Sequence, residues 1–468
     1  MNTINCKKPE REGNARRQIL TALLATIPAF TYGIQIGWLS PMGPLLKSPQ
    51  TPAETPLRDS DVSWMAAALP LAAITGIPFF SYSSDRFGRK ICIIAVSLLS
   101  CISWTLKLSL IQAPALIAAR VIAGVAAAGC FVVVPVYVKE ISEDAWRGAL
   151  ASLTMTVCKV GVIFVYAVGM SAAYSVNQWV YLTLAGLHAI AFAFMPESPN
   201  YLLKIGEAKR AARTIAWLRS VNVASEVVTE EMGKMKAEQR KFDEAPRVTP
   251  LSVVRDKATF AALRMTVVLM GMQTLSGCFA LINYGADVFR RAGAAWSPDT
   301  LTLIMGSLQL LGSLLTTVSI ERFGRKIPLA LSSLVVCLCM ATLGGCFAAG
   351  VEAVPRWLPA LAVCACLFAY GVGLAPVPMV VMAEVFNFQM RARMAGASMA
   401  FSFFCSSMTV LFYTPVVKQF GAHAVFFTFA AVTAFGVLYT VVCVPETKGK
   451  SLEEIRRFWQ KEPEPVFV

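Results

Sequence analysis

The sequence predicts an all-α membrane protein in which twelve transmembrane helices form two similar halves of six. Composition is the first reason: 56% of the 468 residues are hydrophobic and only 15% are charged, whereas a soluble protein has about 25% charged residues. Long uncharged stretches, such as residues 18–46, are the second reason, because a helix needs about 20 mostly apolar residues to cross a bilayer. The third reason is a set of short motifs that occurs twice.

Twelve stretches qualify as spans, and most of the connectors between them are short. In chain order they are residues 18–40, 61–83, 91–111, 114–138, 147–171, 178–195, 259–285, 299–320, 327–349, 356–383, 393–416 and 421–444. Lys and Arg gather in alternate connectors, and the positive-inside rule assigns those connectors to the cytoplasm. We therefore expect both termini to be cytoplasmic, in a multi-pass protein of the plasma membrane.

The spans also define the expected domains. An N-terminal segment (1–17) precedes the first half (18–196), and a tail (446–468) follows the second half (258–445). Between the halves lies a linker (197–257) with 12 basic and 9 acidic residues. Its stretch "EAKRAARTIAWLRS" has apolar residues at helical spacing, which predicts short amphipathic helices on the cytoplasmic face. A flexible linker is the alternative.

Three pairs of motifs indicate that the two halves arose by duplication. "DRFGRK" at 85–90 matches "ERFGRK" at 321–326, and "PESP" at 196–199 matches "PETKG" at 445–449. In the third pair, a Glu is followed seven positions later by an Arg, once at residues 140 and 147 and again at 384 and 391. Two parallel repeats of this kind build transporters whose substrate site lies between the halves, near the middle of the bilayer.

The charged residues of these motifs predict a cytoplasmic gate. Carboxylates at a membrane boundary are costly without partners, and each motif supplies arginines nearby. We expect ion pairs across the helices to latch the two halves together and to break when the protein opens inward, unless these are ordinary positive-inside charges. The predicted gate residues are Asp85, Arg86, Arg89, Glu140, Arg147, Glu321, Arg322, Arg325, Glu384 and Arg391.

Taken together, the motifs resemble those of the sugar porters of the major facilitator superfamily, and among them the facilitated trehalose and glucose transporters of insects. The stretches that carry the resemblance are "DRFGRK", "ARVIAGVAAAG" (119–129), "PVYVKEISEDAWRGAL" (135–150), "PESPNYLL" (196–203), "QTLSG" (273–277), "ERFGRK", "AEVF" (383–386) and "PETKGKSLEEI" (445–455). The resemblance implies the major facilitator fold and alternating access by rocking of the halves. It also implies a sugar held by side-chain amides and an indole.

The residues that the resemblance assigns to the sugar are only partly kept. Of the family's paired glutamines Gln273 remains, while an asparagine position carries Gln309 and a glutamine position carries Met155. The tryptophan that stacks on the sugar falls on Met379. The expected substrate contacts are Gln273, Asn283, Gln309, Thr154, Tyr284, Ser402 and Gln35. Each amide can instead serve as an interhelical hydrogen bond.

Two lysines lie inside predicted spans, where a charge is a functional hypothesis by default. Lys107 is near an extracellular end, and we expect its side chain to extend to the membrane boundary. Lys159 is near the midplane, where it either lines the pathway or pairs with an acid. A lysine in the pathway suits an anionic substrate better than a sugar. The first span has no acid, which favours facilitated transport over proton coupling.

The sequence thus predicts a facilitative transporter of a sugar or a similar small polyhydroxylated solute. Two alternatives stay open: a transporter of a less polar or anionic metabolite, and a non-transporting sugar sensor of the same fold. Only two histidines occur, with no metal-ligand cluster or phosphate-binding loop, so we expect no enzyme, metal or cofactor. The net charge of +14 reflects positive-inside connectors rather than nucleic-acid binding. The expected partners are the solute and the bilayer, and we expect a monomer.

Overall fold

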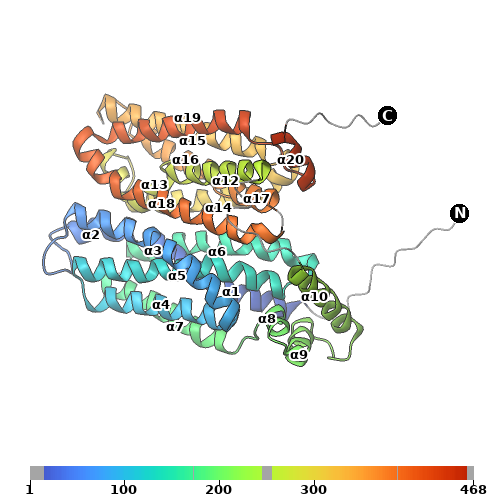
Figure 1. Cartoon of the computed structure of the whole chain (residues 1–468). Coiled ribbons are helices and arrows are strands. Elements are labelled where there is room, and N and C mark those ends of the chain that lie inside the picture. Colours follow the sequence, from blue (N-terminus) through green and yellow to red (C-terminus); the bar gives the residue numbers. More distant parts are fainter. Residues whose placement is uncertain (1–14, 172, 245–255, 351, 387, 461–468) are drawn as a thin grey trace.

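The structure is a computed structural model that describes residues 15–171, 173–244, 256–350, 352–386 and 388–460. These residues form helices joined by turns and short loops. Figure 1 shows the helices in two bodies, one built from α1 to α7 and the other from α12 to α19, with α8 to α10 at one end of the first body. We call the end that carries α8 to α10 and α20 the linker side, and the opposite end, where α2 lies, the loop side.

The first body contains the helices of the first predicted half. They are α1 (Arg16–Gly37), α2 (Leu39–Lys47), α3 (Asp59–Phe87), α4 (Arg89–Ser109), α5 (Ala113–Ile141), α6 (Asp144–Ser171) and α7 (Tyr174–Ala193). In the segment predicted as the linker lie α8 (Pro199–Lys204), α9 (Ala208–Arg219) and α10 (Glu226–Glu244). The first span is therefore two helices that meet at Trp38.

The second body repeats this order. Its elements are α12 (Lys257–Leu275), α13 (Cys278–Arg291), α14 (Pro298–Phe323), α15 (Lys326–Ala349), α16 (Leu358–Ala369), the π-helix η1 (Tyr370–Leu374), α17 (Val377–Val385), α18 (Phe388–Phe420), α19 (Ala422–Cys443) and α20 (Leu452–Gln460). The span that begins this half is also broken: Gly277 separates α12 from α13 with a φ of 83°, a conformation that favours glycine.

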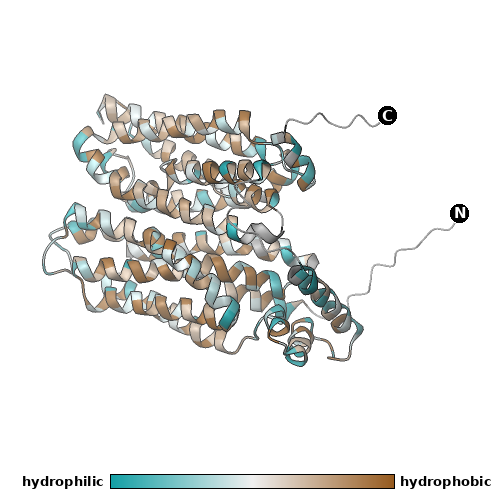
Figure 2. Cartoon of the chain, in the orientation of Figure 1, coloured by the Kyte–Doolittle hydropathy of each residue, from teal (hydrophilic) through white to brown (hydrophobic). Residues whose placement is uncertain are grey.

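Eleven helical spans in the described residues are long and apolar enough to cross a membrane. The predicted span that is not among these eleven, the sixth (178–195), is the helix α7, which carries the buried polar residues Asn177, Gln178 and His188. Figure 2 shows apolar residues over both bodies and hydrophilic ones gathered on α9, α10 and α20. The predicted fold class, an all-α membrane protein of two six-helix halves, is confirmed.

Small residues let the helices of one half approach closely. A Cβ on Gly33 of α1 would collide with the carbonyl oxygen of Cys158 in α6, and one on Gly161 would collide with that of Phe30. A Cβ on Gly312 of α14 would likewise meet the carbonyl oxygen of Phe368 in α16. Close packing of this kind drives helix association in lipid, where there is no hydrophobic force between helices.

Candidate functional site

The first gate cluster joins the linker-side ends of α3, α4 and α5. Arg89, at the start of α4, donates from Nη2 to Oε1 of Glu140 at 3.1 Å and lies 3.5 Å from the Asp85 carboxylate. Ser198 donates its hydroxyl to Glu140, and Nζ of Lys204 is 3.2 Å from Asp85. Residues that follow α7, Ser198 and Lys204, thus bind the two carboxylates of the first cluster.

The second cluster has the same arrangement in the other half. Arg325, just before α15, donates from Nη2 to Oε1 of Glu384 at 2.7 Å. The hydroxyl of Thr447 donates to Oε2 of Glu384 at 2.6 Å, in the role that Ser198 has in the first half. Nζ of Lys448 donates to the carbonyl oxygen of Glu321 at 2.6 Å.

Two carboxylates at the centre of these clusters were missing from the predicted site. Glu197 accepts the backbone N–H groups of Arg89 and Lys90 at 3.0 and 3.1 Å, and so caps α4. Glu446 accepts those of Arg325 and Lys326 at 2.9 and 3.1 Å, and so caps α15. A carboxylate is stabilising at a helix N-terminus because of the helix dipole. The "PESP" and "PETKG" pair was the sequence signal for both.

The glycines of the two basic motifs make room for these carboxylates. Gly88 has a φ of 97° and Gly324 a φ of 79°, a region that side chains other than glycine seldom adopt. A Cβ at Gly88 would collide with Oε2 of Glu197, and one at Gly324 with Oε2 of Glu446. Each glycine is therefore required for two reasons: the turn needs a positive φ, and the glutamate carboxylate lies too close for a Cβ.

In this structure these ion pairs do not join the two halves, and the predicted latch stays a prediction for the conformation that is closed at the linker side. Arg89 pairs with Glu140 and Arg325 with Glu384, and each pair joins helices of one half. The reason is that each basic turn lies beside the glutamate of its own repeat, which is within ion-pair distance of the arginine. Arg86, Glu321 and Arg322 are exposed. Arg147 donates to the carbonyl oxygen of Ser142 at 3.4 Å, and the Arg391 side chain lies outside the described residues.

Several polar contacts join the two halves at the loop side. Asp59 at the start of α3 is 2.7 Å from Nζ of Lys418 at the end of α18. The backbone N–H of Ala286 donates to Oγ of Ser40 at 3.3 Å. Tyr166 of α6 donates its hydroxyl to the carbonyl oxygen of Ile282 at 2.8 Å. The ends of α2, α3 and α6 are thereby tied to α13 and α18.

Toward the linker side the halves separate along α6. Ile163 and Tyr166 face Gly306 of α14, where a Cβ would lie 3.3 and 3.2 Å from their side chains. On the same face of α6, Tyr166 is 1% exposed and Met155 is 37% exposed. Along α6 the interface is thus closed at the loop side and opens toward the linker side, whereas α3 and α18 still pack together at Ile77 and Phe403, near the middle of the bundle.

Three of the predicted substrate residues are engaged within their own half. Gln35 donates to Oγ of Ser103 at 3.3 Å and accepts from Lys107 at 2.5 Å. Asn283 donates to the carbonyl oxygen one turn earlier in α13. Tyr284 donates its hydroxyl to the carbonyl oxygen of Val410 at 3.1 Å. These contacts act as interhelical or intrahelical hydrogen bonds.

The other four predicted substrate residues keep hydrogen-bonding capacity. Gln309 makes no hydrogen bond with another described residue, and Ser402 is half-buried and equally uncommitted. Gln273 donates to the carbonyl oxygen of Ala375, next to the π-helix, at 3.0 Å, while its Oε1 has no partner. The buried hydroxyl of Thr154 also lacks a partner.

The prediction that the Lys107 side chain extends to the membrane boundary is wrong. Its side chain is fully buried, and Nζ lies 4.4 Å from the ring centroid of Trp38 and 3.9 Å from that of Trp104. Aromatic faces attract a cation in this geometry. Two indoles and the amide of Gln35 therefore hold the ammonium group inside the first half.

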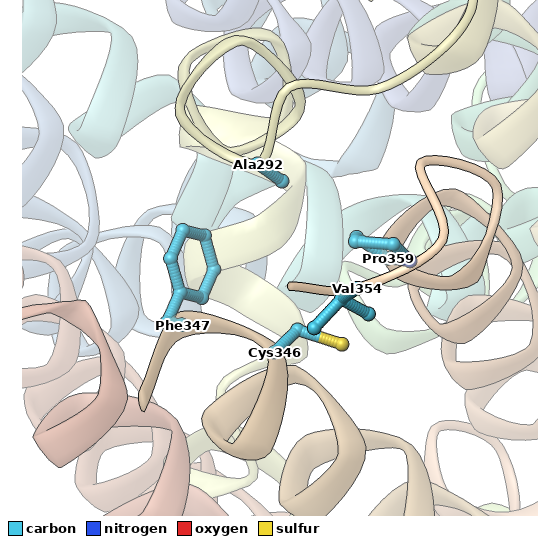
Figure 3. A pocket seen from close by; sticks show the side chains of 5 residues that line it. All are labelled: Ala292, Cys346, Phe347, Val354 and Pro359. Carbon is cyan, nitrogen blue, oxygen red and sulfur yellow. The ribbon is translucent and has the colours of Figure 1, made fainter. Parts of the chain in front are cut away.

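Two pockets lie at the loop side. Figure 3 shows the first, lined by Ala292, Cys346, Phe347, Val354 and Pro359. Its side chains are apolar, so they offer no strong hydrogen-bonding group to a polar solute. The second lies where α2 and the end of α6 face the start of α14, with Tyr174 and Asp299 in its wall.

Residues 21–459 match the family described as Sugar (and other) transporter. The chain is 27% identical over 444 residues to the facilitated trehalose transporter Tret1 of Drosophila grimshawi and 26% identical over 444 residues to that of Culex quinquefasciatus. Each alignment covers 94% of this chain, with 47% and 85% of the relatives. The chain thus spans about half the length of the Drosophila grimshawi protein.

Solved structures of the E. coli xylose transporter XylE share the fold. The inward-open conformation superposes with a TM-score of 0.78 at 19% identity, covering 94% of this chain and 100% of that one. The proton:xylose symporter XylE bound to 6-bromo-6-deoxy-D-glucose gives a TM-score of 0.72 at 20% identity, covering 95% of this chain and 100% of that one. At these identities the likeness shows the fold alone.

Proposed function

This chain belongs to the sugar (and other) transporter family, and on that premise we propose that it carries a sugar or a similar small polyhydroxylated solute across the membrane. The movement is facilitative and follows alternating access between the two halves. The names of the trehalose transporters that it resembles support a sugar. The protein acts as a monomer in the plasma membrane, with both ends in the cytoplasm, as the distribution of Lys and Arg suggests.

One observation carries this proposal: polar contacts join the two halves at the loop side, whereas at the linker side each half has an ion pair of its own. We call these ion pairs, Arg89–Glu140 and Arg325–Glu384, the clamps. The Asp59–Lys418 pair and the Ser40–Ala286 bond cross between the halves. Such exposed or single contacts are each worth about 1 kcal/mol or less, so these two contacts are weak enough to break when the loop side opens. The clamps of Arg89 and Arg325 lie within their halves and can persist while the halves rock.

The solute is bound by polar side chains whose hydrogen-bonding groups are not used within the protein. Gln309, Ser402 and the Oε1 of Gln273 come from the second half, and Thr154 comes from the first. Because each buried amide loses about 1–3 kcal/mol when its partner is absent, a hydroxyl-rich solute is the natural partner. A site between two halves can change its access when they move.

Transport is uncoupled from protons. Residues 13–53, which contain the first span, have no Asp or Glu, and residues 62–84 of the second span have none either. A carboxylate that titrates in the pathway is therefore absent from these spans. A uniporter moves its solute only down the gradient of that solute.

The proposal is tested by uptake into proteoliposomes with labelled trehalose, glucose and a polyol. We expect saturable uptake that persists when the pH gradient is dissipated. Gln309→Ala should lower kcat/KM by about tenfold or more, whereas Gln419→Ala, an exposed glutamine at the loop-side end of α18, should leave it unchanged. Uptake no faster than in protein-free vesicles would contradict transport, and uptake that needs the pH gradient would contradict uniport.

A further inference from the structure

Lys159 lies in the middle of α6, on the face that meets the other half. Ile163 and Tyr166 contact Gly306 of α14, and Lys159 precedes them by four and seven residues. At 3.6 residues per turn these three side chains share one face of the helix. Lys159 is half-buried, one turn closer to the linker side than the point where the halves touch.

Nothing in the described chain neutralises this lysine. It makes no hydrogen bond or ion pair with another described residue. A charged group at the depth of the membrane core is costly and normally pairs with an opposite charge or a polar partner. An ammonium group has three donors, so Lys159 has both a charge and hydrogen bonds available to a ligand.

The whole first half has an excess of positive charge in its interior. Residues 62–84, 86–139 and 145–196 contain no Asp or Glu. Two further cations lie there: Arg120 donates to the carbonyl oxygens of Met65 and Gln35, and Lys107 bonds the Gln35 amide. Their partners are neutral, so no carboxylate offsets the three cations. In a medium of low dielectric constant such a field attracts an anion strongly.

We propose that the transported solute is a sugar acid, whose carboxylate pairs with Lys159 while its hydroxyls bond the second half. Gln309 lies three residues beyond Gly306 on α14, hence close to the level of Lys159, and its amide is uncommitted. The inference rests on the proposed function, because it names the substrate class of that same site. A neutral sugar would leave the lysine without a counter-charge in both conformations of the transporter.

Two ligands that differ at one carbon distinguish a sugar acid from a neutral sugar as the substrate. D-glucuronate carries a carboxylate where D-glucose carries a hydroxymethyl group, so a comparison of the two isolates the charge. We expect purified full-length protein in proteoliposomes to take up labelled glucuronate with a kcat/KM at least about tenfold above that for glucose, the scale of one hydrogen bond to a charged group. Lys159→Gln should remove this preference, and Lys159→Arg should keep it.

A matched control and a binding measurement guard against misfolding. Lys209→Gln removes an exposed lysine of α9 and should leave the preference for glucuronate intact. In detergent, glucuronate should raise the Tm of the wild type but not that of Lys159→Gln. Glucose preferred over glucuronate by the wild type, or a ratio that Lys159→Gln leaves unchanged, would overturn the sugar-acid substrate and leave sugar transport standing. No uptake of either ligand would overturn both.

Discussion

The two halves carry the same linker-side clamp, yet they bury it to different degrees. In the first half, the side chains of Arg89 and Glu140 are each 10% exposed. In the second half, Arg325 is 12% exposed but Glu384 is 27% exposed. The first clamp also has Tyr201 of α8 beside it: its ring centroid lies 5.5 Å from the Arg89 guanidinium carbon, and its hydroxyl donates to the carbonyl oxygen of Arg86.

The capping glutamates of the two halves also differ, in the direction of their pKa shifts. Burial raises the pKa of Glu197 above its ordinary 4.5, against the effect of the N–H groups of Ser198, Lys90 and Arg89. Burial also acts to raise the pKa of Glu446, but the N–H bonds to that carboxylate outweigh it and lower the pKa. The comparison shows that the duplicated motif sets the positions of the ion pairs and caps, while the packing around each motif sets how buried the carboxylates are and in which direction their pKa shifts.

Removal of the clamp arginines should give the largest difference between the halves. We expect Arg89→Ala to lower the free energy of unfolding by about 3 kcal/mol, because it strands a buried Glu140. Arg325→Ala should cost about 1–2 kcal/mol, because water already reaches Glu384. Thermal unfolding in detergent, followed by a thiol-reactive dye, measures both.

The double variants then sharpen this result. Arg89→Ala with Glu140→Ala should recover part of the stability, since no buried charge is left alone, and Arg325→Ala with Glu384→Ala should recover less. Equal losses in the two halves would contradict the role that we assign to burial.

The pH dependence should have opposite signs in the two halves. A raised pKa means that the folded state binds the proton of Glu197 more tightly than the unfolded state, so its contribution to stability is present below pH 4.5 and is lost as the pH rises through the folded pKa. The lowered pKa of Glu446 gives a contribution that is present above pH 4.5 and is lost as the pH falls.

Unfolding measured from about pH 4 to pH 8 checks this expectation. Relative to the wild type, Glu197→Gln should gain stability as the pH rises above 4.5. Glu446→Gln should lose most at neutral pH, and its deficit should shrink in acid. The same trend in both variants would show that the two caps do not differ.

The smallest effect is expected at the loop side, where Asp59 binds two lysines. Lys418 comes from the second half and is 60% exposed, whereas Lys47 belongs to the same half as Asp59. Lys418→Ala should shift the balance toward an open loop side by a few fold, equivalent to less than about 1 kcal/mol, and Lys47→Ala should not. Accessibility of a cysteine placed at Ser40 to a membrane-impermeant thiol reagent reports the shift, and equal labelling of both variants would count against the assignment.

The sequence revealed the fold because its signals are periodic and repeated. Uncharged stretches marked the spans, and the paired motifs marked the duplication, which the family match supports. The partners of Arg89 and Arg325 were harder to predict, because carboxylates of either half were available at that membrane face. The burial of Lys107 also escaped prediction, since its shelter between Trp38 and Trp104 depends on how α1 and α4 cross.

The substrate residues show the same limit. A polar residue in a span is visible in the sequence, but its hydrogen-bond partner is not. Gln35 and Gln309 looked alike as amides in apolar stretches, yet Gln35 is committed to Lys107 and Ser103, whereas Gln309 is uncommitted. Only the packing of the helices distinguishes the two.

Alternating access is tested most directly by locking the loop side. Oγ of Ser40 lies 3.3 Å from the backbone nitrogen of Ala286, so Ser40→Cys with Ala286→Cys places two thiols on opposite halves where those halves meet, and a bifunctional thiol cross-linker joins them if they are too far apart for a disulfide. Solute uptake into proteoliposomes should stop when this variant is oxidised and return when it is reduced, while each single variant transports throughout. Undiminished uptake by the fully cross-linked protein would contradict the account.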